Sequence, residues 1–170
     1  MPLTPHSSSP VIVIGHINHD RIWRLNSTLR PGARISWSQR RIRLGGGGYY
    51  TARRLIDLGR SVRLVASLCD DAHGRWARDV LTARHFDLSA VAVAAGETDC
   101  ADVLLEPNGE RTILSGEKRI SRSFSIAAPI AGEAFYVNGA RLCDAIVRSL
   151  DAAPLVLSQF EKNIRWEDIP

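Results

Sequence analysis

The sequence is short of the features that mark membrane-spanning and secreted chains. No stretch approaches the roughly 20 consecutive apolar residues that a membrane span needs, and we predict no membrane association. The first ten residues have neither the basic start nor the apolar centre of a signal peptide, so we predict a disordered tail over residues 1–10. Cysteine is sparse: Cys69, Cys100 and Cys143 are widely spaced and match neither a metal-binding pattern nor a disulfide framework. This usage favours a reducing environment, and we predict a cytoplasmic protein.

Lysine is also scarce. Arginine therefore carries almost all the positive charge of the chain, whose net charge is +4. The densest basic patch is Arg40, Arg41 and Arg43. Elsewhere the cations are interspersed with acids, and no nucleic-acid-binding motif accompanies them. We therefore predict a solvated face and no nucleic-acid partner, although the same charge is compatible with an anionic small molecule.

A chain of 170 residues fits a single domain with a hydrophobic core of its own. Residues 11–14 form a continuous apolar run of the kind that is buried in a parallel sheet. Further strands are predicted over 62–68, 134–137 and 155–159. Helices are predicted from residue 50 to the glycine at 59, over 72–84 and over 139–152. This alternation predicts an α/β fold with a doubly wound, mainly parallel sheet.

Two hairpins interrupt the alternation. The first has strands at about 20–26 and 34–44, punctuated by Pro31-Gly32. The second has strands at about 100–106 and 110–115, which flank the turn Pro107-Asn108-Gly109, and Asn-Gly is a strong hairpin signal. We expect the hairpins to form a small additional sheet lying over the main one.

The residues with a chemical role cluster around two short segments. Asn18 and Asp20 are two apart in an extended segment, so both side chains point the same way. An amide beside a carboxylate offers donors and acceptors that suit adjacent sugar hydroxyls. The run Gly45 to Gly48 lets a ligand approach the backbone closely. The alternative roles are a cap or turn for Asp20 and a flexible hinge for the glycines.

Three other site types are excluded by spacing. A phosphate-binding P-loop needs a lysine followed by serine or threonine, whereas Tyr49 and Tyr50 follow the glycines. A dinucleotide fingerprint needs a third glycine at a fixed spacing in the helix and a buried strand before the turn. This chain has neither, because no glycine occupies that position and the strand before Gly45 is amphipathic. His16 and His19 fall on opposite sides of an extended strand, so we predict no metal site there.

Taken in order, these elements resemble the N-terminal half of the ribokinase-like sugar kinase family, of the phosphofructokinase-B type. The resemblance covers roughly residues 11 to 158. The matching motifs are Gly15-x-x-x-x-Asp20, Pro31-Gly32, Gly45-Gly46, Leu58-Gly59, Asp70-Asp71-x-x-Gly74 and Pro107-Asn108-Gly109. The resemblance implies that residues 11–170 are a truncated ribokinase-like domain, a doubly wound α/β unit with a β lid and with its C-terminal half missing.

The resemblance also implies a function. Members of this family are ATP-dependent kinases that phosphorylate a sugar or nucleoside hydroxyl, and the complete enzyme uses ATP and Mg²⁺. Carried over, Asp20 holds sugar hydroxyls with help from Asn18, and the backbone of Gly45, Gly46 and Gly47 borders the sugar. Tyr50 and Glu161 are the further expected substrate contacts. The lid strands close over the site and offer a surface for a homodimer.

The sequence departs from the family pattern at several points. Tyr50 stands where the family usually has a sugar-binding asparagine, and the motifs D-T-x-G-A-G-D and N-x-x-E do not occur. We therefore expect no catalytic residue in this chain, weak binding of ATP and Mg²⁺, and negligible kinase activity from these 170 residues alone. The alternatives are a non-catalytic sugar-binding or interaction module and an unrelated nucleotide-binding α/β protein.

Overall fold

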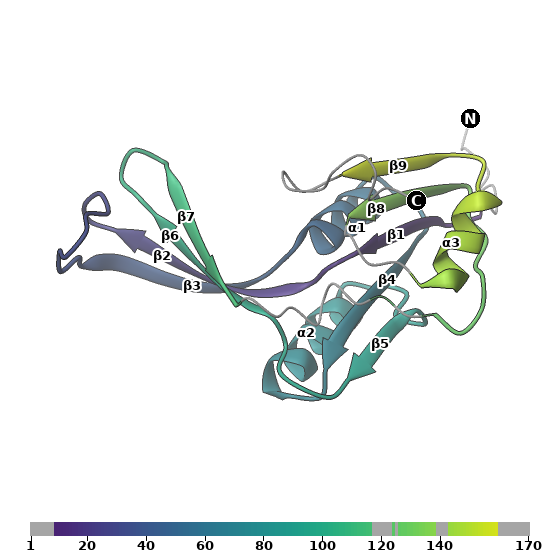
Figure 1. The fold of residues 1–170 in the computed structure, drawn as a ribbon, viewed down its shortest axis with the longest axis horizontal. Coiled ribbons are helices and arrows are strands. Elements are labelled where there is room, and N and C mark those ends of the chain that lie inside the picture. Colours follow the sequence, from purple (N-terminus) through teal and green to yellow (C-terminus); the bar gives the residue numbers. More distant parts are fainter. Residues whose placement is uncertain (1–8, 117–123, 125, 139–142, 160–170) are drawn as a thin grey trace.

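The computed structural model describes residues 9–116, 124, 126–138 and 143–159. Within these ranges the main sheet has the strand order β5-β4-β1-β8-β9, and every neighbouring pair is parallel (Figure 1). Its strands are β1 (Val11–Gly15), β4 (Val62–Cys69), β5 (Val91–Ala94), β8 (Ala134–Asn138) and β9 (Val156–Gln159). Four of these match predicted strands to within about a residue, whereas β5 was not predicted.

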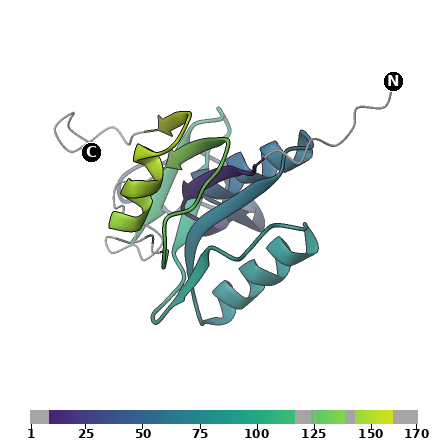
Figure 2. The same cartoon turned by 90° about the vertical axis from the view of Figure 1, so that its right-hand side faces the viewer.

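Helices cover both faces of the main sheet (Figure 2). Val11 and Val13 of β1 pack on the side of α1 (Gly47–Asp57) and α2 (Ala72–Ala83). Ile12 and Ile14, which alternate with them, pack on the side of α3 (Asp144–Asp151). Both faces of β1 are therefore buried, as its unbroken apolar sequence requires. The predicted doubly wound, mainly parallel α/β class is confirmed.

The helix bounds differ from expectation at two places. Helix α1 begins at Gly47 instead of residue 50, with Gly46 as its N-cap. Helix α3 begins at Asp144, and residues 139–142 of the predicted helix lie outside the described residues. None of the helices found in the described ranges combines the length and apolar character needed to cross a membrane.

The two hairpins form one sheet of four strands, which we call the projecting sheet. Its strands are β2 (Asn18–Leu25), β3 (Trp37–Gly45), β6 (Cys100–Leu105) and β7 (Arg111–Ser115), in the order β3-β2-β6-β7. Parallel pairing between β2 and β6 joins the hairpins. The sheet extends away from the main sheet and does not lie flat over it, because β2 continues the line of β1 after two residues (Figure 1).

Asp71 ties the start of α2 to the segment that enters the projecting sheet. As the N-cap of α2, its carboxylate accepts a hydrogen bond from the Gly74 N–H at 2.7 Å. It also accepts bonds from the Thr98 N–H at 2.9 Å and the Thr98 hydroxyl at 2.7 Å. Burial alone raises the pKa of Asp71, but these hydrogen bonds outweigh it and hold the pKa below its ordinary value.

We expect Asp71→Asn to lower the free energy of unfolding by about 1–2 kcal/mol at pH 7, because the substitution removes the charged cap. A carboxylate with a lowered folded-state pKa stabilises the protein above its unfolded-state pKa, and this stabilisation is lost as pH falls through the folded-state value. The difference between the two proteins should therefore shrink below about pH 4. Urea unfolding across this pH range measures it.

Asp70→Asn is the matched control, because Asp70 is exposed and pairs with Arg75 at the surface. Its effect should stay within about 0.5 kcal/mol. Equal destabilisation by the two substitutions would contradict the assigned role of Asp71.

Candidate functional site

The predicted site residues that the structure describes lie near the point where the chain reverses its direction of winding through the main sheet. From β1 the chain proceeds to β4 and β5 on one side, while β8 and β9 lie on the other. The carboxyl ends of β1 and β8 are neighbours there, with Gly15 opposite Asn138. In open α/β sheets such a switch point leaves a crevice in which ligands bind.

The glycine run brings the first turn of α1 directly onto the end of β1. A Cβ atom on Gly48 would lie 2.5 Å from the carbonyl carbon of Gly15, which is closer than any side chain tolerates. The contact is therefore backbone against backbone. It places the N-terminal end of α1 at the switch point.

Asp20 lies against this glycine run. A Cβ atom on Gly45 would lie 1.8 Å from the Asp20 carboxylate oxygen Oδ2, so glycine at this position leaves the space that the carboxylate fills. Asn18 is the register partner of Gly45 and lies on the same face of β2 as Asp20. The structure thus brings Asn18, Asp20 and Gly45 together.

Asn138 is a site residue that the sequence reasoning missed. A Cβ atom on Gly47 would lie 2.4 Å from the Asn138 side-chain oxygen, so this amide borders the glycine run. Asn138 and Asn18 are each 8% exposed, and within the described residues neither side-chain oxygen has a hydrogen-bond partner. A buried acceptor left without a donor is costly, and a ligand hydroxyl would satisfy it. The sequence signal that could have identified Asn138 was an asparagine at the end of an apolar strand.

Tyr50 follows on α1, with 47% of its surface exposed. Burial of part of the ring raises the pKa of its phenol, and the negative charge of Asp20 raises it further. The phenol is therefore protonated at neutral pH and close enough to Asp20 to sense its charge. Glu161 lies outside the described residues.

The two histidines of the first segment lie in different surroundings. His16 belongs to the connection between β1 and β2, and its Nε2 atom accepts a hydrogen bond from the Gly47 N–H at 3.5 Å. His19 is 4% exposed and stacks on His73 of α2 with ring centroids 4.0 Å apart. Burial lowers the pKa of His19, and the neighbouring charges of His73 and Arg21 lower it further. His16 therefore supports the glycine run, whereas His19 belongs to the base of the projecting sheet.

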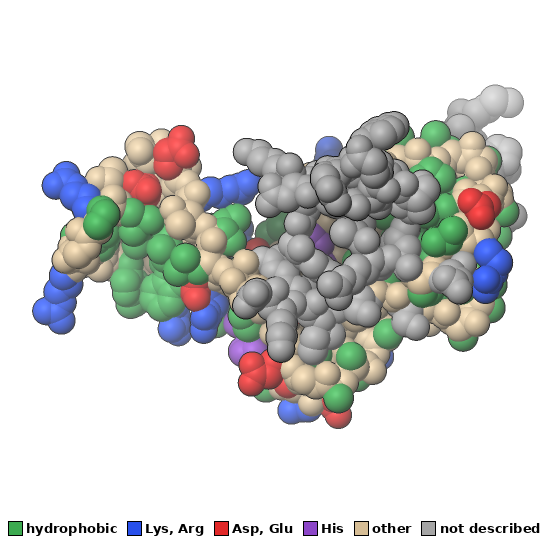
Figure 3. Space-filling model, in the orientation of Figure 1, with side chains coloured by type: hydrophobic (Ala, Val, Ile, Leu, Met, Phe, Trp, Pro, Cys, Tyr) green, Lys and Arg blue, Asp and Glu red, His purple; other side chains and the backbone are tan. Residues whose placement is uncertain are grey.

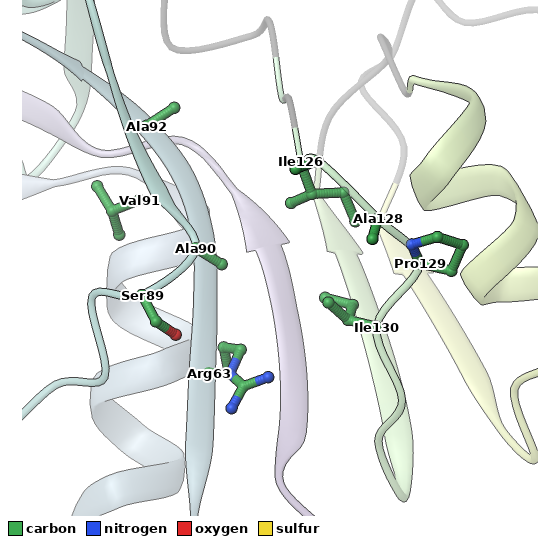
Figure 4. Close-up of a pocket in the computed structure, with 10 residues that line it drawn as sticks. Arg63, Ser89, Ala90, Val91, Ala92, Ile126, Ala128, Pro129 and Ile130 are labelled. Carbon is green, nitrogen blue, oxygen red and sulfur yellow. The ribbon is translucent and has the colours of Figure 1, made fainter.

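A separate hollow of about 320 Å³ lies between β5 and residues 126–130 (Figure 4). Its lining is mainly apolar and includes Ala90, Ala92, Ile126 and Ile130. Arg63 also borders it, but its guanidinium is paired with Asp87 at 2.8 Å. The hollow adjoins the amino ends of β4 and β5, away from the switch point, so we do not place the ligand site there.

Solved structures with the same fold include ribokinases and related kinases. Ribokinase from Giardia lamblia matches with a TM-score of 0.76 and 15% identity, over 95% of this chain and 54% of that one. Arabidopsis thaliana ribokinase, complexed with ribose and ATP, matches with a TM-score of 0.66 and 20% identity, over 88% and 53%. The nucleoside kinase of Methanocaldococcus jannaschii, a member of the ribokinase family, matches with a TM-score of 0.60 and 14% identity, over 78% and 46%.

These likenesses confirm the predicted resemblance at the level of the fold, which is ribokinase-like. The chain spans about half the length of the solved structures that it matches. No protein-family model matches it.

We expect Gly48→Ala to lower the free energy of unfolding by at least about 2 kcal/mol, because the new methyl group meets the backbone of β1, which cannot move aside. Gly45→Ala is the matched comparison, since its methyl group meets the Asp20 side chain, which can rotate away. Urea unfolding of both variants measures the difference. A Gly48→Ala protein as stable as the parent would contradict the close contact between α1 and β1.

Proposed function

We propose that this site binds a sugar or nucleoside as the phosphate acceptor of an ATP-dependent kinase, and that the chain carries the acceptor-binding half of that enzyme. The observation that supports it most directly is the meeting of Asp20, Asn18 and Asn138 beside a glycine run at the switch point of a ribokinase-like fold. The ribokinase and nucleoside kinase structures with this fold support the same class of acceptor.

The side chains suit a ligand with several hydroxyl groups. The Asp20 carboxylate accepts hydrogen bonds from two hydroxyls, and the bond to a charged acceptor is stronger than one to a neutral group. The amide oxygens of Asn18 and Asn138 accept further hydroxyl protons, while their NH₂ groups donate to ring or hydroxyl oxygens. The bare backbone from Gly45 to Gly47 lets the ligand approach without meeting side chains.

ATP is the proposed phosphate donor, with Mg²⁺ to neutralise the charge on its phosphates. The negative charge of the Asp20 carboxylate at the switch point repels a triphosphate, and the neutral amides of Asn18 and Asn138 supply no positive charge to hold one. We therefore assign no residue of this half to ATP or Mg²⁺. The proposed kinase acts in the cytoplasm, as the cysteine usage predicts.

The projecting sheet is proposed to act as a lid and as the contact between two copies of the chain. It is a single layer of four strands, so neither face is fully covered within it. Ile42 and Leu114, on the face opposite Asp20, are 47% and 55% exposed. Figure 3 shows apolar side chains gathered over this sheet, with basic side chains at its margins. Burying such a surface against a second copy is favourable.

We expect Asp20→Ala to weaken binding of ribose or a nucleoside at least tenfold, because it removes the acceptor for two hydroxyls (about 1.4 kcal/mol per factor of ten). Isothermal titration calorimetry of the full chain measures the affinity. Asp57→Ala on α1 is the control, since this carboxylate lies at the surface beside Arg53 and should leave binding unchanged. Equal sugar affinity of the Asp20→Ala variant and the parent protein would contradict the proposal.

The Asp20→Ala variant also separates the proposed function from the alternative of an unrelated nucleotide-binding protein. Lost sugar binding with nucleotide binding intact supports the acceptor half of a kinase. The reverse pattern supports an unrelated nucleotide-binding α/β protein.

For the pairing of two copies, we expect sedimentation of the parent chain to show a dimer. Ile42→Lys combined with Leu114→Lys should produce a monomer, because each substitution places a charge in the buried contact. Val93→Lys is the matched control, since Val93 is 54% exposed but lies in the main sheet. A parent chain that sediments as a monomer at high concentration would overturn this arrangement.

A further inference from the structure

Three metal-ligating side chains meet at the base of the projecting sheet, on the face opposite Asp20. They are His19 of β2, Cys100 of β6 and His73 in the first turn of α2. One ligand atom from each lies within 4.8 Å of the other two. His19 and Cys100 are register partners on adjacent strands, and the Cys100 sulfur is 3.5 Å from Nδ1 of His19.

The spacing of the His19 and Cys100 ligand atoms matches a tetrahedral transition-metal site. Zinc binds histidine nitrogen at about 2.0–2.1 Å and cysteine sulfur at about 2.3 Å, which places neighbouring donors roughly 3.3–3.8 Å apart. The pair formed by His19 and Cys100 already has this separation. His73 is exposed, so its imidazole can rotate about its side-chain torsions to complete the set without movement of the backbone.

The chemistry of the donors fits a transition metal. His19 is almost fully buried, whereas His73 lies at the surface. Two nitrogens and one sulfur form a donor set that suits zinc, whereas Mg²⁺ and Ca²⁺ prefer oxygen.

We propose that His19, His73 and Cys100 form a zinc-binding site that links the projecting sheet to α2. The three protein ligands leave a fourth position for water. Two ligands belong to strands of the projecting sheet, and the third belongs to α2, which packs on the main sheet. Bound zinc therefore restrains the projecting sheet at its base. Figure 3 shows histidine side chains (purple) at the surface where these two parts meet.

The test uses the full chain, freed of metal by dialysis against a chelator and titrated with Co²⁺ as a spectroscopic probe. We expect one Co²⁺ per chain, the visible absorption of tetrahedral cobalt, and a near-ultraviolet band from cobalt bonded to thiolate. Zinc should displace the cobalt with the same stoichiometry. Cys100→Ser should abolish the near-ultraviolet band, and His73→Asn should weaken zinc binding at least about tenfold.

Two matched variants serve as controls. Cys143→Ser alters another partly exposed cysteine at the start of α3, and His85→Asn alters an exposed histidine just beyond the end of α2. Both should bind Co²⁺ and zinc as the parent does. His73 is exposed, so its variant is expected to fold, which circular dichroism checks. The absence of saturable binding, or binding unchanged in both Cys100→Ser and His73→Asn, would overturn the proposal.

Discussion

The contact between the first turn of α1 and the end of β1 is the constraint on which the candidate site depends. Gly48 and Gly15 meet there backbone to backbone, and a single methyl group on Gly48 would separate the two elements. Their closeness fixes the path of the preceding glycines, and this path leaves the space that the Asp20 carboxylate occupies. The place of the Asp20 carboxylate beside the glycine run therefore depends on a contact between α1 and β1 that involves no side chain.

Hydrogen bonds and ring packing join the base of the projecting sheet to α2. Asp71, the N-cap of α2, bonds to Thr98, just before β6, through two short hydrogen bonds. On β2, the His19 ring packs edge-on against Trp76 of α2 with centroids 5.3 Å apart. Farther out, Arg21 and Trp23 share the Asp102 carboxylate across the pairing of β2 with β6. Directional bonds of this kind specify geometry more narrowly than apolar contact does.

Local signals were sufficient to predict much of the fold. The unbroken apolar run at β1 and the Asn108-Gly109 turn each depend on neighbours in sequence, and the structure shows both. Strand β5 was missed because it is short and half alanine, which is typical of no single state. The early start of α1 was missed because Gly47 is a poor helix former, held in the helix by its tertiary surroundings. Asn138 joins the site only through the pairing of β8 with β1, and no spacing in the sequence reveals such a register.

The parallel pairing of β2 with β6 has a consequence for how the chain folds. Arg21 and Asp102, which bond across it, are 81 residues apart, and the segment between them contains α1, β4, α2 and β5. Each hairpin alone is a two-stranded ribbon of marginal stability. Contacts between such distant residues form slowly, because a long loop must close before they contribute. By this argument the pairing of β1 with β4, which are nearer in sequence, is expected to form before β6 reaches the edge of β2.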